Sequence, residues 1–90
     1  MNREIEKKIW PSYFDLVSSG KKKYELRLAD FEVSEGDTLV LKEWDPDNKQ
    51  YTGRQIRKIV TQVGHLDVTD EKFWSKEQKE KFGFHIISIE

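Results

Sequence analysis

The sequence predicts an α+β domain, in which a small mixed or antiparallel β-barrel carries two short helices. Five segments have the residue patterns of β-strands, two short segments have helical patterns, and tight turns join most of them within 90 residues. This arrangement favours a compact sheet over a helical bundle or a doubly wound sheet. Closure into a barrel would also leave so small a sheet without exposed edges. The length supports one core, so we expect a single domain over residues 1–90.

The first strand and the first helix are predicted from the spacing of apolar residues. Ile5 and Ile9 alternate with charged neighbours over residues 4–9, the period-two pattern of a strand that covers a core with one face. Pro11 favours the first turn of a helix, and apolar pairs three residues apart follow it before Gly20, a residue that commonly ends helices. We therefore predict a short helix over residues 11–19.

Residues 23–28 show the clearest alternation in the chain. Tyr24, Leu26 and Leu28 fall on one face of the predicted strand, and Lys23, Glu25 and Arg27 fall on the other. The apolar face is expected to lie on the core, and the charged face in solvent.

The rest of the chain is predicted as turn 34–37, strand 38–44, type I turn 45–48, strand 51–63, loop 64–74, helix 75–83 and strand 84–89. The helix is indicated by the capping-box spacing of Ser75 and Gln78 and by Gly83 at its end. Gly53 lies inside a predicted strand, which indicates either a bulge or a point where a ligand comes close to the backbone.

Composition excludes several classes of function. With 16 Lys and Arg against 17 Asp and Glu, the formal net charge is −1, so the molecule as a whole is not drawn to nucleic acid or to a lipid surface. The absence of cysteine excludes disulfides, thiolate metal sites and a cysteine nucleophile. His65 and His85 do not have metal-site spacing, so we expect no metal and no cofactor. The charged N-terminus and the lack of a long apolar run support neither export nor a membrane span, so we expect a cytoplasmic protein with no membrane partner. We also expect a monomer.

The residues from Gly20 to Arg27 concentrate charge at one place. A glycine turn leads through three lysines into the strand that carries Glu25 and Arg27. These two residues are about 6.6 Å apart along the strand, at a rise of ~3.3 Å per residue, so their side chains can meet or hold one small polar ligand beside Lys22. The alternative is a solvated turn with a surface ion pair worth ~0–1 kcal/mol.

Gly20, Lys22, Glu25 and Arg27 fit the GxKxxExR signature of ASCH domains, which belong to the PUA-like superfamily. The chain also resembles a small ASCH-related branch over nearly its whole length. The matching blocks, in chain order, are Pro11–Phe14, Gly20–Lys22, Tyr24–Arg27, Glu35–Asp37, Leu39–Trp44, Tyr51–Arg54 and Ile86–Ile89. The resemblance implies a PUA-like β-barrel with a cleft beside the motif strand that engages RNA or a nucleotide.

Some ASCH relatives are amidohydrolases that remove an acetyl group from modified cytidine, and Lys22 matches the lysine that acts in them. Where those relatives have a threonine, this chain has Glu25, which cannot supply a hydroxyl nucleophile. Thr52 would replace it only if the fold places it beside Lys22. The alternative function is therefore a hydrolase acting on a modified nucleoside or on RNA, with Lys22 and Glu25 as catalytic residues.

The leading prediction is an RNA- or nucleotide-binding module. Lys22, Glu25 and Arg27 would recognise polar groups of the ligand, and Arg54 would hold a phosphate beside Thr52. Three aromatic residues are candidates for stacking on a base, namely Trp10, Trp44 and Tyr51. Packing within the core is the alternative for these rings. A third possibility is a protein-binding scaffold in which Glu25 and Arg27 form only a structural ion pair.

Overall fold

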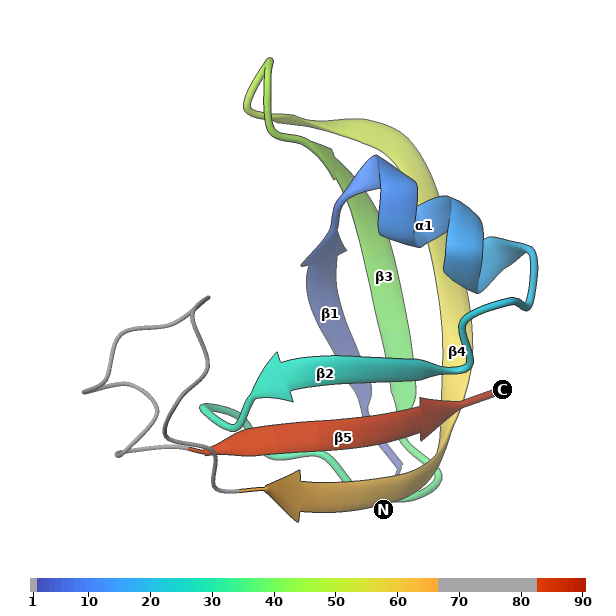
Figure 1. Ribbon diagram of the computed structural model, residues 1–90, viewed down its shortest axis with the longest axis vertical. Helices are drawn as coiled ribbons and strands as arrows, with labels where there is room; N and C mark the ends of the chain where they lie inside the picture. Colours follow the sequence, from blue (N-terminus) through green and yellow to red (C-terminus); the bar gives the residue numbers. More distant parts are fainter. Residues whose placement is uncertain (1, 67–82) are drawn as a thin grey trace.

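The computed structural model describes residues 2–66 and 83–90 of the chain. These residues form one short helix and five strands (Figure 1), which in chain order are β1 (Glu4–Ile9), α1 (Pro11–Ser18), β2 (Tyr24–Leu28), β3 (Thr38–Asp45), β4 (Gln50–Leu66) and β5 (Phe84–Ile89). The predicted strands and the first predicted helix are therefore confirmed, with small differences at their ends. The helix predicted over residues 75–83 lies almost wholly outside the described residues.

The five strands form one mixed sheet in the order β1-β3-β4-β5-β2. β1 is parallel to β3, and the other neighbouring pairs are antiparallel. β4 is long enough to pair with β3 through its first part and with β5 through its last part, with a register shift between Val60 and Gln62. In Figure 1, β2, β5 and the end of β4 cross in front of β1 and β3, so the sheet folds over on itself.

The sheet is open, so the prediction of a closed PUA-like barrel is wrong; of the two predicted helices, the structure describes only the first, α1. β1 and β2 stand at opposite ends of the strand order and do not pair with each other. One side-chain contact joins these two edges: Arg27 Nη2, on β2, donates a hydrogen bond to the carbonyl oxygen of Lys8, on β1, at 2.8 Å. A closed barrel would need backbone hydrogen bonds between β1 and β2. No local pattern in the sequence encodes that pairing.

The core lies between the two parts of the folded sheet and beneath α1. Its buried members come from the helix and four of the strands: Ile9, Phe14, Val17, Leu39, Leu41, Val60, Ile87 and Ile89. Pro11 occupies the first turn of α1, where its missing N–H costs no hydrogen bond, and the three-residue spacing of Phe14 and Val17 turns both side chains inward. We call the side of β1, β3 and β4 that faces this core the inner face, and the opposite side the outer face.

The predicted orientation of β2 is wrong. Glu25 is only 2% exposed, whereas Tyr24 and Leu26 are 52% and 41% exposed. Leu26 lies opposite the exposed Ile86 of β5, so the apolar side chains of β2 point away from the core. The alternation itself is correct, but the charged side chains occupy the interior because Glu25 finds two cationic partners there.

A buried carboxylate fixes the turn that leads into β3. Asp37 accepts hydrogen bonds from the backbone N–H groups of Arg3, at 2.9 Å, and Ser34, at 2.8 Å. These bonds, with the nearby Arg3 guanidinium, hold the pKa of Asp37 below its usual value. Asp37 therefore ties the start of β1 to the predicted turn, and its role is structural.

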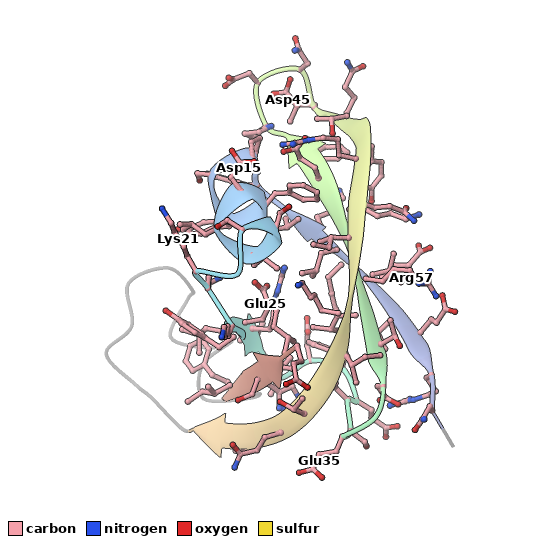
Figure 2. The ribbon with its side chains drawn as sticks, turned by 90° about the vertical axis from the view of Figure 1, so that its right-hand side faces the viewer. Asp15, Lys21, Glu25, Glu35, Asp45 and Arg57 are labelled. Atoms are coloured by element: carbon pink, nitrogen blue, oxygen red, sulfur yellow. The ribbon has the colours of Figure 1, made fainter. Side chains whose placement is uncertain are left out.

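The predicted turn after β3 is also present. Asp45 Oδ1 accepts a hydrogen bond from the backbone N–H of Asp47 at 2.9 Å, and Asp45 Oδ2 accepts one from the side-chain amide of Asn48 at 2.7 Å. These bonds close the hairpin between β3 and β4 at the end of the molecule that Figure 2 labels with Asp45.

Candidate functional site

The three charged residues of the sequence motif converge in the structure. Glu25 Oε1 accepts a hydrogen bond from Lys22 Nζ at 3.0 Å, and Glu25 Oε2 accepts one from Arg27 Nε at 2.9 Å. Arg27 Nη2 also lies 2.8 Å from Glu25 Oε2. The carboxylate is buried, while both cations keep partial access to solvent. We call Lys22, Glu25 and Arg27 the motif cluster; in Figure 2, Glu25 lies between α1 and the layer of β2 and β5.

The turn between α1 and β2 places Lys22 in this cluster. Gly20 has a φ of 81°, a left-handed conformation that ends the helix at little steric cost. The backbone N–H of Lys22 then donates to the carbonyl of Leu16 at 3.0 Å, which holds the turn against the helix. The predicted convergence of the motif is therefore correct, although it lies inside the fold rather than on a solvent-facing strand face.

Two tyrosines flank the motif cluster, and the sequence analysis did not assign either of them to the site. The ammonium of Lys22 lies 4.9 Å from the centre of the Tyr13 ring on α1 and 5.3 Å from that of the Tyr24 ring on β2. Both rings are about half exposed. Tyr24 was expected in the core, so its availability follows from the reversed orientation of β2.

Thr52 and Arg54 belong to a second cluster, centred on Glu43. Thr52 Oγ1 donates to Glu43 Oε1 at 2.6 Å, and Arg54 Nε donates to the same oxygen at 2.9 Å. Arg54 Nη2 pairs with Glu43 Oε2 and reaches Asp15 on α1 at 3.2 Å. We call Glu43, Thr52, Arg54 and Asp15 the Glu43 network. Among the described residues, Thr52 contacts Glu43 and Arg54 and not Lys22, so it does not replace the threonine of the amidohydrolases.

The Glu43 network is held firmly in its charged form. The hydrogen bonds from Arg54 and then Thr52 lower the pKa of Glu43, despite its burial. The same contacts with Glu43 and Asp15 raise the pKa of Arg54. The guanidinium also stacks over the Phe14 ring, with Cζ 4.4 Å from the ring centre. Arg54 is therefore already engaged by protein groups, and this weakens its assignment as a free phosphate-binding residue.

Sequence reasoning missed Glu43, although the sequence contained a signal for it. Glu43 is in phase with Leu39 and Leu41 in a period-two strand, and both leucines are fully buried. A carboxylate on the core face of a strand must have partners, because burying an unpaired charge is costly. The arginine and hydroxyl of the neighbouring strand supply them.

Gly53 marks an irregularity in the pairing of β3 with β4. The register shifts between Lys42 and Trp44, and Gly53, with a φ of 97°, lies opposite that shift. Of the two alternatives for Gly53, the bulge is present. A Cβ atom at Gly53 would have no heavy atom within 4 Å, so the space beside this backbone is open.

Trp44 and Tyr51 lie together on the outer face, away from the motif cluster. Their rings meet edge to face with centres 5.0 Å apart, and Lys8 Nζ lies 3.8 Å from the centre of the Trp44 ring. Figure 2 shows Arg57, another outer-face residue, on the side of the sheet opposite to Glu25. Lys8 was not predicted. We call Lys8, Lys42, Trp44 and Tyr51 the outer aromatic surface.

Trp10 stands apart from these clusters. It precedes the first residue of α1, and its carbonyl oxygen accepts a hydrogen bond from the backbone N–H of Phe14 at 2.8 Å. Its ring is 55% exposed. In the part of the chain that the structure describes, no ring or cation contact links Trp10 to Trp44 or Tyr51.

The two histidines are neighbours across β4 and β5. Their ring centres are 5.8 Å apart, and His85 Nε2 lies 2.9 Å from the carbonyl oxygen of Phe31. Within residues 2–66 and 83–90, no three His, Asp or Glu side chains gather as a metal site would require. Over the same ranges, no helix is long and apolar enough to cross a bilayer.

Comparisons with known proteins place the chain in a family. The model of a family described as a domain of unknown function (DUF3850) matches residues 5–74. A protein of Escherichia phage P2, named "Uncharacterized 12.9 kDa protein in GpA 3'region", is 42% identical over 69 residues, which make up 77% of this chain. The matched region spans 57% of that phage protein.

The fold is similar to a solved structure. The crystal structure of hypothetical protein PH0355 superposes with a TM-score of 0.71 at 20% sequence identity, and the match covers 100% of this chain and 98% of the other. At this level of identity the likeness concerns the fold alone.

Proposed function

Because the chain belongs to the DUF3850 family, whose description names no activity, we propose from the site itself that it binds RNA or a nucleotide through the motif cluster. The observation that carries this proposal is a buried Glu25 carboxylate that holds Lys22 and Arg27 on its two oxygens. Two cations against one carboxylate leave one positive charge at a partly exposed position. Such a position suits a phosphate or a base carbonyl.

Glu25 acts as a positioning residue in this proposal. Both of its oxygens already accept hydrogen bonds from cations, so the carboxylate orients Lys22 and Arg27 rather than binding the ligand. Lys22 has three N–H donors and uses one on Glu25. Arg27 uses Nε and Nη2 on Glu25 and Lys8. The remaining donors of the two side chains are available to an anionic or carbonyl group.

The flanking tyrosines supply an aromatic component. Tyr13 and Tyr24 each present a half-exposed ring within about 5 Å of the Lys22 ammonium. A base that stacks on such a ring contributes ~1–3 kcal/mol, and its phosphate would remain close to Lys22. A cationic phosphate-binding group beside aromatic rings is the combination expected for a nucleotide rather than for inorganic phosphate.

The ASCH signature supports the same class of ligand. Gly20, Lys22, Glu25 and Arg27 match all four fixed positions of GxKxxExR, and the last three form the motif cluster. We propose that this family shares the ligand-binding motif of ASCH domains, although its sheet here is open.

The geometry favours binding over hydrolysis. A general base needs a free oxygen or nitrogen within hydrogen-bond reach of the attacking water. Both oxygens of Glu25 are occupied, and Lys22 is a donor in the same ion pair. Thr52, the residue that the sequence offered in place of the amidohydrolase threonine, donates its hydroxyl to Glu43 and does not lie beside Lys22 in the described part of the chain.

A nuclear magnetic resonance titration tests the proposal. Adenosine, cytidine and uridine 5′-monophosphates and a short RNA are added to ¹⁵N-labelled protein, and we expect shifts that centre on Lys22, Tyr24 and Arg27. Lys22→Gln should weaken binding at least about ten-fold, because a charge-assisted hydrogen bond is worth ~1.5–3 kcal/mol. Lys21→Gln makes the same change of charge at an exposed neighbour and should leave affinity within about two-fold. No shift near the motif cluster at millimolar ligand would contradict the proposal.

A further inference from the structure

We propose that the outer aromatic surface is a second binding site, which takes one nucleotide unit of a single-stranded nucleic acid. It lies on the opposite face of the sheet from the motif cluster, so this inference does not depend on the function proposed above. The base would stack on Tyr51, and the adjoining phosphates would be held by Lys8 and Lys42.

Tyr51 presents the ring on which a base would stack. Its side chain is 51% exposed, on the outer face of β4. Trp44 supports it from β3 in an edge-to-face arrangement, with an interplanar angle of 80°. Lys8 already lies over the Trp44 ring, so Tyr51 has the more accessible face of the two. A ring held by a neighbour loses little conformational freedom when a base stacks on it.

Two ammonium groups lie at almost the same distance from this ring. Lys8 Nζ is 5.8 Å and Lys42 Nζ is 5.9 Å from the centre of Tyr51. Lys42 pairs with Glu6 at 3.0 Å. Lys8 forms no ion pair within the part of the chain that the structure describes, and its ammonium lies over the Trp44 and Tyr51 rings. The surface therefore carries an uncompensated cation next to a stacking platform, the combination that single-stranded nucleic acid binders use.

The surface around Tyr51 is hollowed on two sides. One depression of about 190 Å³ is lined by Lys42, Tyr51, Gly53, Arg54 and Gln55. Another of about 380 Å³ is lined by Glu6, Lys7, Lys8, Lys42 and Tyr51, so it holds three lysines and one carboxylate. The missing side chain at Gly53 keeps the first depression open. Tyr51 and Lys42 line both depressions, so there is space beside the stacked base for the neighbouring nucleotides.

Charge limits the size of the site. For single-stranded nucleic acid, the logarithm of the binding constant falls linearly with the logarithm of the salt concentration, with a slope of about −0.7 for each neutralised phosphate. Contacts from Lys8 and Lys42 therefore predict a slope of about −1.4, which is shallow and agrees with a net charge of −1.

The test is a titration of ¹⁵N-labelled protein with an eight-nucleotide oligouridine, monitored at the backbone amides of Tyr51, Gly53 and Gln55. We expect these amides to shift together, including in a Lys22→Gln background, which separates this site from the motif cluster. Tyr51→Ala should weaken the affinity at these amides by about five-fold or more, whereas Tyr51→Phe should retain it. Ile59→Ala is the matched control, because Ile59 is a similarly exposed apolar side chain of the same strand and belongs to neither proposed site.

Two further measurements separate stacking from charge. An abasic oligomer of the same length carries the same phosphates and should bind at least about five-fold more weakly. Lys8→Gln should reduce the salt slope by about half, while Lys21→Gln should leave it unchanged. The inference is overturned if the outer-face amides do not shift, if Tyr51→Ala binds like the parent protein, or if the abasic oligomer binds equally well.

Discussion

At the scale of single residues, the buried Glu25 determines how the site is arranged. An isolated carboxylate inside a protein is strongly disfavoured, and it becomes acceptable only when opposite charges and hydrogen bonds surround it. Lys22 and Arg27 provide both, from a turn and from the same strand. The three side chains therefore depend on one another, and the removal of one changes the environment of the other two.

Replacing the Glu25 carboxylate should destabilise the fold. Glu25→Gln keeps the volume but leaves two partly buried cations without a counter-charge, so we expect a loss of about 2–4 kcal/mol in the free energy of unfolding. Equilibrium urea denaturation measures this loss. Glu32→Gln is the control, since that side chain is 91% exposed and lies 3.6 Å from Arg3, and it should cost less than ~0.5 kcal/mol. Equal effects of the two substitutions would show that Glu25 has no special structural role.

The two faces of β2 show what the sequence alone could and could not predict. The motif identified Lys22, Glu25 and Arg27 because the spacing of charged residues matched a known signature. Period-two alternation distinguishes the two faces of a strand. It does not say which face is buried when the charged side chains can form ion pairs with one another. Tyr24 was consequently assigned to the core, and its place beside Lys22 was missed.

At the scale of elements, β4 carries two glycines that serve different purposes. Gly53 has a φ of 97° and lies at the bulge, whereas Gly64 sits in the regular part of the strand opposite Ile86. A Cβ atom at Gly64 would lie 3.7 Å from the carbonyl oxygen of Ile86, an ordinary contact. Only Gly53 therefore has a backbone conformation that needs glycine.

Alanine substitutions should separate the two glycines. Gly53→Ala forces a side chain into the left-handed region and should cost about 1–2 kcal/mol, even though there is space for the methyl group. Gly64→Ala should change stability by less than ~1 kcal/mol in either direction. Thermal or urea unfolding of both variants provides the comparison. A Gly53→Ala variant as stable as the parent protein would show that the bulge does not require its observed backbone.

The elements themselves were predictable, since each depends on a local pattern. Alternation identified β1 and β2, β-rich composition after a turn identified β3, and Pro11 and Gly20 delimited α1. The long β4 was predicted to end at residue 63 and continues to Leu66. The pairing partner, β5, extends the strand there through the register from Val63 to Leu66. The pairing of β4 with β5 joins segments that are distant in the sequence, so the local residue pattern of β4 cannot predict it.

At the scale of the whole molecule, stability should depend on pH through a few carboxylates. Hydrogen bonds from the backbone of Arg3 and Ser34 lower the pKa of Asp37, and those from Arg54 and Thr52 lower the pKa of Glu43. A carboxylate with a lower pKa in the folded state binds fewer protons there than in the unfolded state. Its contribution is therefore complete above the unfolded value near 4 and is lost as the pH falls through the folded value.

Urea denaturation at a series of pH values should reveal this dependence. We expect the unfolding midpoint to be nearly constant around neutral pH and to fall progressively below about pH 5. Glu43→Gln should flatten the acid part of the curve, because one of the linked carboxylates is removed. Glu35→Gln, at an exposed position, should leave the shape of the curve unchanged. An acid limb of the same slope in Glu43→Gln would exclude Glu43 from the linkage.

The open sheet is the part of the architecture that the sequence did not reveal. The prediction of a barrel rested on the need to protect edge strands. β1 meets that need differently, since its alternating charged side chains discourage pairing with another chain. Five strands in this order can be open or closed, and the choice depends on whether β1 and β2 approach each other.

The hydrogen bond from Arg27 to the Lys8 carbonyl has a further consequence for the molecule as a whole. The same guanidinium belongs to the proposed ligand site and links the two edge strands of the sheet, β2 and β1. Ligand binding at the motif cluster is therefore linked to how easily β1 and β2 separate, so a ligand that immobilises Arg27 should slow amide hydrogen exchange along β1. The protein would then report a nucleotide bound at the motif cluster through the rigidity of β1, the strand at the far edge of the sheet from β2.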